Sequence, residues 1–184
     1  MASSRLRLLA GAALAALAAG AEAGERYGLG RRATEAEIAA WNIDVDRDGR
    51  KLPPGSGSVA QGRGVFEAQC ASCHGARGEG GSGDRLAGGR GSLASGNPIK
   101  TVGSFWPYAP TLFDYIRRAM PMTAPQSLSA DEVYAVSAYI LHLNGLVPED
   151  ATLDAGSLAA IRMPNRDGFV PDPRPDAPRA KAPD

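Results

Sequence analysis

The chain has 184 residues, and its 20 basic and 20 acidic side chains give a formal net charge of zero at pH 7. This balance argues against nucleic acids and anionic membrane surfaces as partners, because both attract strongly basic proteins. Glycine and proline are abundant, with 23 and 14 residues, and few runs alternate as strands do. We therefore expect an all-α protein of short helices joined by long irregular connections.

The first 23 residues have the features of a secretory signal. Two arginines precede a short apolar run at 8–19, and Ala-Glu-Ala at 21–23 matches a small-x-small cleavage site. The run is shorter than the roughly 20 residues that a transmembrane helix needs. We expect cleavage after Ala23, export to the periplasm and no membrane span in the mature chain.

The remaining chain is predicted to divide into an N-terminal arm, a core domain, a C-terminal arm and a disordered proline-rich tail, at 24–57, 58–146, 147–170 and 171–184. Within the first arm, Thr34 and Glu37 have the spacing of a capping box for a short helix that ends at Trp41. Asp44 begins a stretch that imitates a calcium loop. Its twelfth position is Gly55 instead of the required glutamate, so we interpret it as a solvated turn.

The first core helix is predicted over residues 58–69, with Gly62 allowing another helix to approach closely. It leads into Cys70-Ala71-Ser72-Cys73-His74, the attachment signature of a c-type haem. We expect Cys70 and Cys73 to form thioethers to one porphyrin and His74 to bind its iron.

Other uses of the two cysteines are weaker interpretations. They are the only cysteines in the chain, and a zinc site would need two further Cys or His ligands. Only His142 is available, outside the motif. A redox-active C-x-x-C would also require a thioredoxin-like strand and helix around it.

Residues 75–103 are rich in glycine and poor in apolar side chains, and we expect packing against a porphyrin to order them. An aromatic cluster follows, in which Trp106 and Tyr108 could pack on the haem edge or also donate a hydrogen bond to a propionate. Both roles stay open. Thr111 is then predicted to cap a helix that runs to Arg118.

Met120 follows that helix directly, and Pro121 ends the helix there. A low-spin electron-transfer haem favours a soft sixth ligand opposite histidine, and a thioether has that character. Met120 is the favoured ligand of the iron. The alternatives are Met122, Met163 and His142.

The last core helix is predicted to begin with a capping box formed by Ser129 and Glu132 and to end at Asn144-Gly145. His142 lies opposite the apolar stripe of this helix, which favours an exposed or partner-facing position. One further helical turn is expected near residues 157–162. The stripe itself consists of Val133, Val136, Ile140 and Leu143.

This order of elements resembles class I cytochrome c over about residues 58–146. The resemblance implies that family's fold, with three to four short helices around one covalent haem c and irregular arms at both ends. It also implies a crossing of the first and last helices near Gly62 and Tyr139, and His74 and Met120 as axial ligands. Electron transfer with both ligands retained would follow, and the chain would not be an enzyme on its own.

A second set of motifs spans most of the mature chain, at residues 28–31, 37–41, 43–45, 52–57, 100–104, 106–108, 112–121, 124–128 and 163–169. These motifs resemble SoxD-type and sulfite dehydrogenase cytochrome subunits. The resemblance implies electron transfer from a molybdenum-cofactor subunit that oxidises sulfite or protein-bound sulfur, and onward to a further cytochrome c or oxidase. The chain has one C-x-x-C-H and so differs from two-haem members.

Three functions are alternatives to an electron-transfer subunit. A free-standing soluble electron carrier shares every feature of the core and stays an alternative. A peroxidase would need an open sixth position and a distal acid–base residue, and a ligand sensor would need a labile site. The second histidine of the core, His142, is expected to lie opposite the apolar stripe of its helix, which disfavours the peroxidase.

Overall fold

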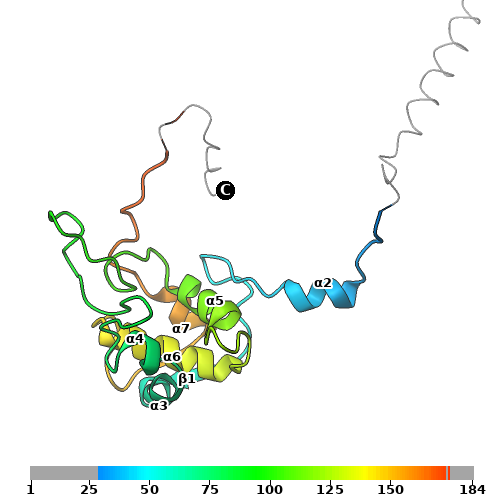
Figure 1. Ribbon diagram of the computed structural model, residues 1–184, viewed down its shortest axis with the longest axis horizontal. Coiled ribbons are helices and arrows are strands. Elements are labelled where there is room, and N and C mark those ends of the chain that lie inside the picture. The colour runs from blue at the N-terminus through cyan, green and yellow to red at the C-terminus, as the bar shows by residue number, and fades with distance from the viewer. Residues whose placement is uncertain (1–28, 173, 175–184) are drawn as a thin grey trace, which may run out of the picture. The chain divides into compact units, whose positions relative to one another are not determined.

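The computed structural model describes residues 29–172 and 174 (Figure 1). The described chain divides into two units, the first ending at Ala40 and the second beginning at Trp41. The expected signal at 1–23 lies outside the described residues, as does nearly all of the expected tail at 171–184. Within the described ranges, no helix is both long enough and apolar enough to cross a membrane.

The described part of the first unit contains helix α2, Glu35–Trp41, which ends one residue inside the second unit. The predicted capping box is confirmed. The N–H of Glu37 donates to Oγ1 of Thr34 over 3.3 Å, and the N–H of Thr34 donates to the Glu37 carboxylate over 2.8 Å. None of the seven residues of α2 is buried.

The second unit consists of short helices and one small two-stranded sheet, with a long loop between α4 and α5 (Figure 1). In chain order its elements are β1 (Ser56–Ser58), α3 (Val59–Gln69), α4 (Ala71–His74), α5 (Ala109–Ala119), α6 (Ala130–Leu143), β2 (Thr152–Asp154) and α7 (Ala155–Ala160).

Helices α3 and α6 pack on each other at a glycine, as the resemblance implies. A Cβ atom on Gly62 would lie 1.8 Å from the carbonyl oxygen of Ala135, so only glycine permits this approach. One turn further along, the rings of Phe66 and Tyr139 meet edge to face with centroids 5.3 Å apart. The predicted capping box at the start of α6 is also present, because Ser129 and Glu132 bond each other's backbone N–H.

The predicted start of α5 is wrong. The helix begins at Ala109 with Tyr108 as its N-cap residue, so Thr111 already lies inside it. Pro110 suits the first turn, where its missing N–H is not needed. The Thr111 hydroxyl donates back to the carbonyl of Tyr108 over 2.6 Å, and the Asp114 carboxylate accepts the N–H of Val45 over 2.8 Å.

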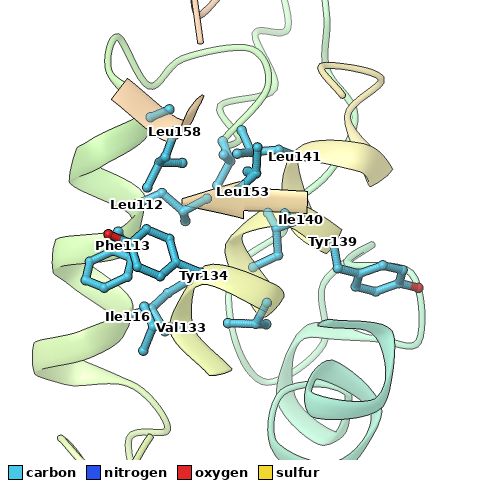
Figure 2. Close-up of a cluster of buried hydrophobic side chains, with 14 of the residues drawn as sticks. Leu112, Phe113, Ile116, Val133, Tyr134, Tyr139, Ile140, Leu141, Leu153 and Leu158 are labelled. Carbon is cyan, nitrogen blue, oxygen red and sulfur yellow. The ribbon is translucent and has the colours of Figure 1, made fainter. Parts of the chain in front are cut away.

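The core lies between α5 and α6 and extends to β2 and α7 (Figure 2). Side chains from these four elements point toward one another, and the rings of Phe113 and Tyr134 have centroids 4.5 Å apart. Tyr139 points away from this cluster, toward α3. The other labelled members of the cluster are Leu112, Ile116, Val133, Ile140, Leu141, Leu153 and Leu158.

The stretch after residue 147 contains the expected helical turn, as α7, and also a strand that the sequence did not indicate. Strand β2 pairs antiparallel with β1, with Leu153 opposite Gly57. Helix α7 begins two residues before the expected turn, because the Asp154 side chain accepts the N–H of Ser157 and caps it. Leu153, Leu158 and Met163 are buried in the core.

Candidate haem-binding site

One short helical turn carries both thiols and the imidazole of the C-x-x-C-H motif. Cys70 ends α3 and precedes α4, and the N–H groups of Cys73 and His74 both donate to its carbonyl, over 3.1 and 3.0 Å. Cys70 is half-buried and Cys73 is exposed, and neither forms a disulfide. The turn therefore leaves both sulfurs available to the two vinyl groups of one porphyrin.

The His74 ring is held in the orientation that a metal ligand needs. Its Nδ1 lies 2.6 Å from the carbonyl oxygen of Asp84, and a carbonyl can only accept. Nδ1 therefore carries the proton, and the lone pair of Nε2 is left for a metal ion. Asp84 thus acts through its backbone, which gives no signal in the side-chain pattern of the sequence.

The glycine-rich loop wraps closely around this turn. The N–H of Gly80 donates to the carbonyl of His74 over 2.7 Å, and the N–H of Gly83 donates to that of Cys73 over 2.9 Å. A Cβ atom on Gly83 would lie 2.8 Å from Cε1 of His74. The loop is therefore ordered by backbone hydrogen bonds, and at Gly83 the approach to His74 leaves no room for a side chain.

Asn144, at the end of α6, fastens the same loop to the core. Its Oδ1 accepts the N–H of Gly88 over 3.1 Å, while its Nδ2 donates to the carbonyls of Leu86 and Ile140 over 3.1 and 2.9 Å. A Cβ atom on Gly103 would lie 2.3 Å from the Asn144 amide. The sequence indicated Asn144 only as the end of a helix.

The environment of Cys70 argues against a redox-active dithiol. Burial, together with the nearby Cys73, raises the pKa of the Cys70 thiol to about 11. A reactive C-x-x-C cysteine has a lowered pKa, because the thiolate is the nucleophile. Among the described residues, no group of three or more His, Cys, Asp or Glu side chains could hold a bare metal ion.

The candidates for the sixth iron ligand have very different surroundings. Met120 is half-buried at the end of α5, next to the core, and its N–H donates to the carbonyl of Ile116 over 3.0 Å. Met122 is 75% exposed, whereas Met163 is 1% exposed and fills the core. His142 is half-buried, with Nδ1 lying 3.2 Å from the carbonyl oxygen of Val147. Of these three methionines, only Met120 is both partly accessible and packed against the core.

The two aromatic candidates have protein partners of their own. The Trp106 ring meets Tyr115 edge to face with centroids 5.9 Å apart. Guanidinium groups of Arg47 and Arg166 lie 5.7 and 4.5 Å from the centroid of the Tyr108 ring. Contact of either ring with a haem stays a prediction.

Comparisons with known proteins agree with this site. Residues 57–140 match the family described as cytochrome c oxidase, cbb3-type, subunit III. The chain is also similar to a chain of the sulfane dehydrogenase SoxCD from Paracoccus pantotrophus, with 48% sequence identity and a TM-score of 0.75. The match covers 81% of this chain and 74% of that one. The chain belongs to the family of SoxD-type cytochromes c. Among curated proteins, a sequence search finds no match.

Membership of the cytochrome c family implies haem c as the cofactor, and the residues present fit it. Two adjacent thiols, an oriented imidazole and a packed thioether are the donors that such a haem uses. Half-buried apolar side chains of Leu86, Trp106 and Leu128, like Met120, pack against the hydrophobic core. This SoxD-type cytochrome therefore has the donor set of an electron-transfer protein.

Proposed function

We propose that this chain is the electron-transfer subunit of a molybdenum-containing sulfur or sulfite dehydrogenase. The observation that carries the proposal is the 48% identity to a chain of sulfane dehydrogenase SoxCD over 81% of this sequence. The chain receives electrons from the catalytic subunit and passes them to a further cytochrome. It works in the periplasm after removal of residues 1–23.

One haem c would be held by Cys70 and Cys73 through thioethers and by His74 and Met120 through its iron. Bound haem supplies a one-electron ferric/ferrous couple. The Asp84 carbonyl fixes the proton of His74 on Nδ1 and so holds the ring in one orientation. With His74 and Met120 both bound to the iron, no position on the metal would be left for a substrate.

The terminal regions fit a role in assembly. The match to the SoxCD chain covers far more of the sequence than residues 57–140, so the similarity extends beyond the haem-binding stretch. We assign residues 24–57 and 147–170 to arms that flank a cytochrome domain at 58–146, and the second arm is anchored in the core of that domain by Leu153, Leu158 and Met163. On this proposal, parts of both arms bind the catalytic subunit.

The first experiment compares optical spectra of the wild-type protein and Met120→Leu after maturation with haem. The oxidised wild type should show the weak red absorption band of iron bound to methionine sulfur, and Met120→Leu should lose it. Met122→Leu is the matched control and should keep the band, because Met122 is 75% exposed. A band that survives in Met120→Leu would contradict the assigned ligand.

A second experiment tests the placement of His74. Gly83→Ala should disturb the ring, because the new Cβ would lie 2.8 Å from Cε1, and should shift the reduction potential or lower haem incorporation. Gly96→Ala is the control in the same loop, since nothing lies within 4 Å of its Cβ position. Equal behaviour of the two variants would show that the loop does not position His74.

A further inference from the structure

Helix α2 presents large apolar side chains to solvent. Trp41 is 81% exposed and Ile38 is 44% exposed, and their spacing of three residues puts them on one side of the helix. Leu29, shortly before the helix, is 85% exposed. Single exposed apolar residues are common on protein surfaces, but here a tryptophan and an isoleucine share one helix face and form a small apolar patch.

The helix is stabilised by its own first turn. Besides the capping box of Thr34 and Glu37, the Arg31 guanidinium donates to both oxygens of the Glu37 carboxylate, one of them over 2.8 Å. Hydrogen bonds from Arg31 and then from Thr34 lower the pKa of Glu37 to about 2. The Glu37 carboxylate is therefore ionised at any physiological pH and keeps these hydrogen bonds. They stabilise the helix that holds Ile38 and Trp41 on one face.

The size of this face argues against a dimer of the chain through α2. A tryptophan buries roughly 150–250 Å² at most, and a stable interface buries about 800 Å² on each partner. Three side chains thus supply only part of an interface. The three apolar side chains are therefore expected to form one part of a larger interface with another protein.

We propose that α2 binds an apolar groove on the molybdenum-containing catalytic subunit through Ile38 and Trp41. The inference rests on the proposed function and names the contact that holds the two subunits together at this end. Tryptophan is enriched among residues that dominate interface energy, so Trp41 is the expected anchor. The occupant is the catalytic subunit because the related chain belongs to a dehydrogenase and shares sequence well beyond residues 57–140.

The experiment measures binding of full-length haem-loaded cytochrome to the catalytic subunit by co-purification and by titration. Trp41→Ala combined with Ile38→Ala should raise Kd by at least about thirty-fold, as for other anchor residues. The haem spectrum and melting temperature should not change, because no residue of α2 is buried. Ala36→Gln, on the opposite side of the same helix, is the control and should bind as the wild type does.

The outcomes separate the inference from the proposed function. If wild-type protein fails to bind the catalytic subunit, the proposed function is wrong and the free-standing carrier is favoured. If the wild type and the double variant bind equally well, only the role of α2 is overturned. A wild-type dimer that the double variant turns into a monomer would assign the face to a second copy and overturn the inference.

Discussion

Helices α2 and α7 are both short and both begin with a complete capping box, yet only α7 contributes to a core. α2 has seven residues, none buried, whereas α7 has six and buries Leu158 completely. Caps decide where a helix begins, and each is worth only about 1 kcal/mol. Whether a terminal helix belongs to the folded domain is decided by the apolar side chains that it buries.

The largest expected effect comes from removing the buried side chain of α7. Leu158→Ala should lower the free energy of unfolding by about 2–5 kcal/mol, because it leaves a cavity in the core. Ile38→Ala on α2 is the matched control and should change it by less than about 0.5 kcal/mol. Urea unfolding of haem-loaded protein measures both. Similar losses in the two variants would abolish the distinction between the helices.

A smaller loss of stability is expected from a substitution in β1, the strand that pairs with β2. A Cβ atom on Gly57 would lie 2.3 Å from the backbone nitrogen of Ala135, so Gly57→Ala must push β1 away from α6. We expect a loss of about 1–3 kcal/mol in urea unfolding, the usual cost of overpacking. Gly156→Ala, in α7, has its nearest neighbour at 3.7 Å and should leave stability unchanged or raise it slightly. A stable Gly57→Ala would show that the sheet adds little.

The smallest effect is a difference in acid sensitivity between the two capping carboxylates. Hydrogen bonds, led by the Ser157 N–H, lower the pKa of Asp154 from 3.8. Because the pKa of Asp154 is lower in the folded state, its ionised side chain stabilises the fold at any pH above the unfolded-state pKa. This stabilisation is lost as the pH falls through the folded-state pKa. The melting temperature of Asp154→Asn should therefore fall less than that of wild type below about pH 4.

Glu37 provides the matched control for that titration. Its pKa is lowered to about 2, but it caps a helix that buries nothing. Glu37→Gln should therefore follow the wild-type melting curve over the whole acid range. If Glu37→Gln and Asp154→Asn show the same change, α2 unfolds together with the domain.

The sequence predicted local features well and distant pairings poorly. Each feature that was recognised involves only a few neighbouring residues. These features are the motif that ends in His74 and the capping boxes at Thr34 and Ser129. The start of α5 was predicted wrongly because Thr111 bonds a carbonyl inside the helix instead of capping it. Strands β1 and β2 were missed because each has three residues, too few for an alternating pattern.

The candidate site divides in the same way. The donors Cys70, Cys73, His74 and Met120 are side chains whose chemistry is visible in the sequence. The groups that hold them in place are backbone atoms, such as the carbonyl of Asp84 and the N–H of Gly83. Any residue type supplies such atoms, so only the folded loop reveals which ones are used.

The pairing of β1 with β2 sets an order of events during folding. Ser56 pairs with Asp154, about 100 positions later, and such distant contacts form slowly because closing a long loop costs entropy. The turn that carries Cys70 and Cys73 closes through hydrogen bonds between neighbouring residues. When the chain emerges with its N-terminus first, Cys70 and Cys73 are therefore available for haem attachment before β2 can pair with β1.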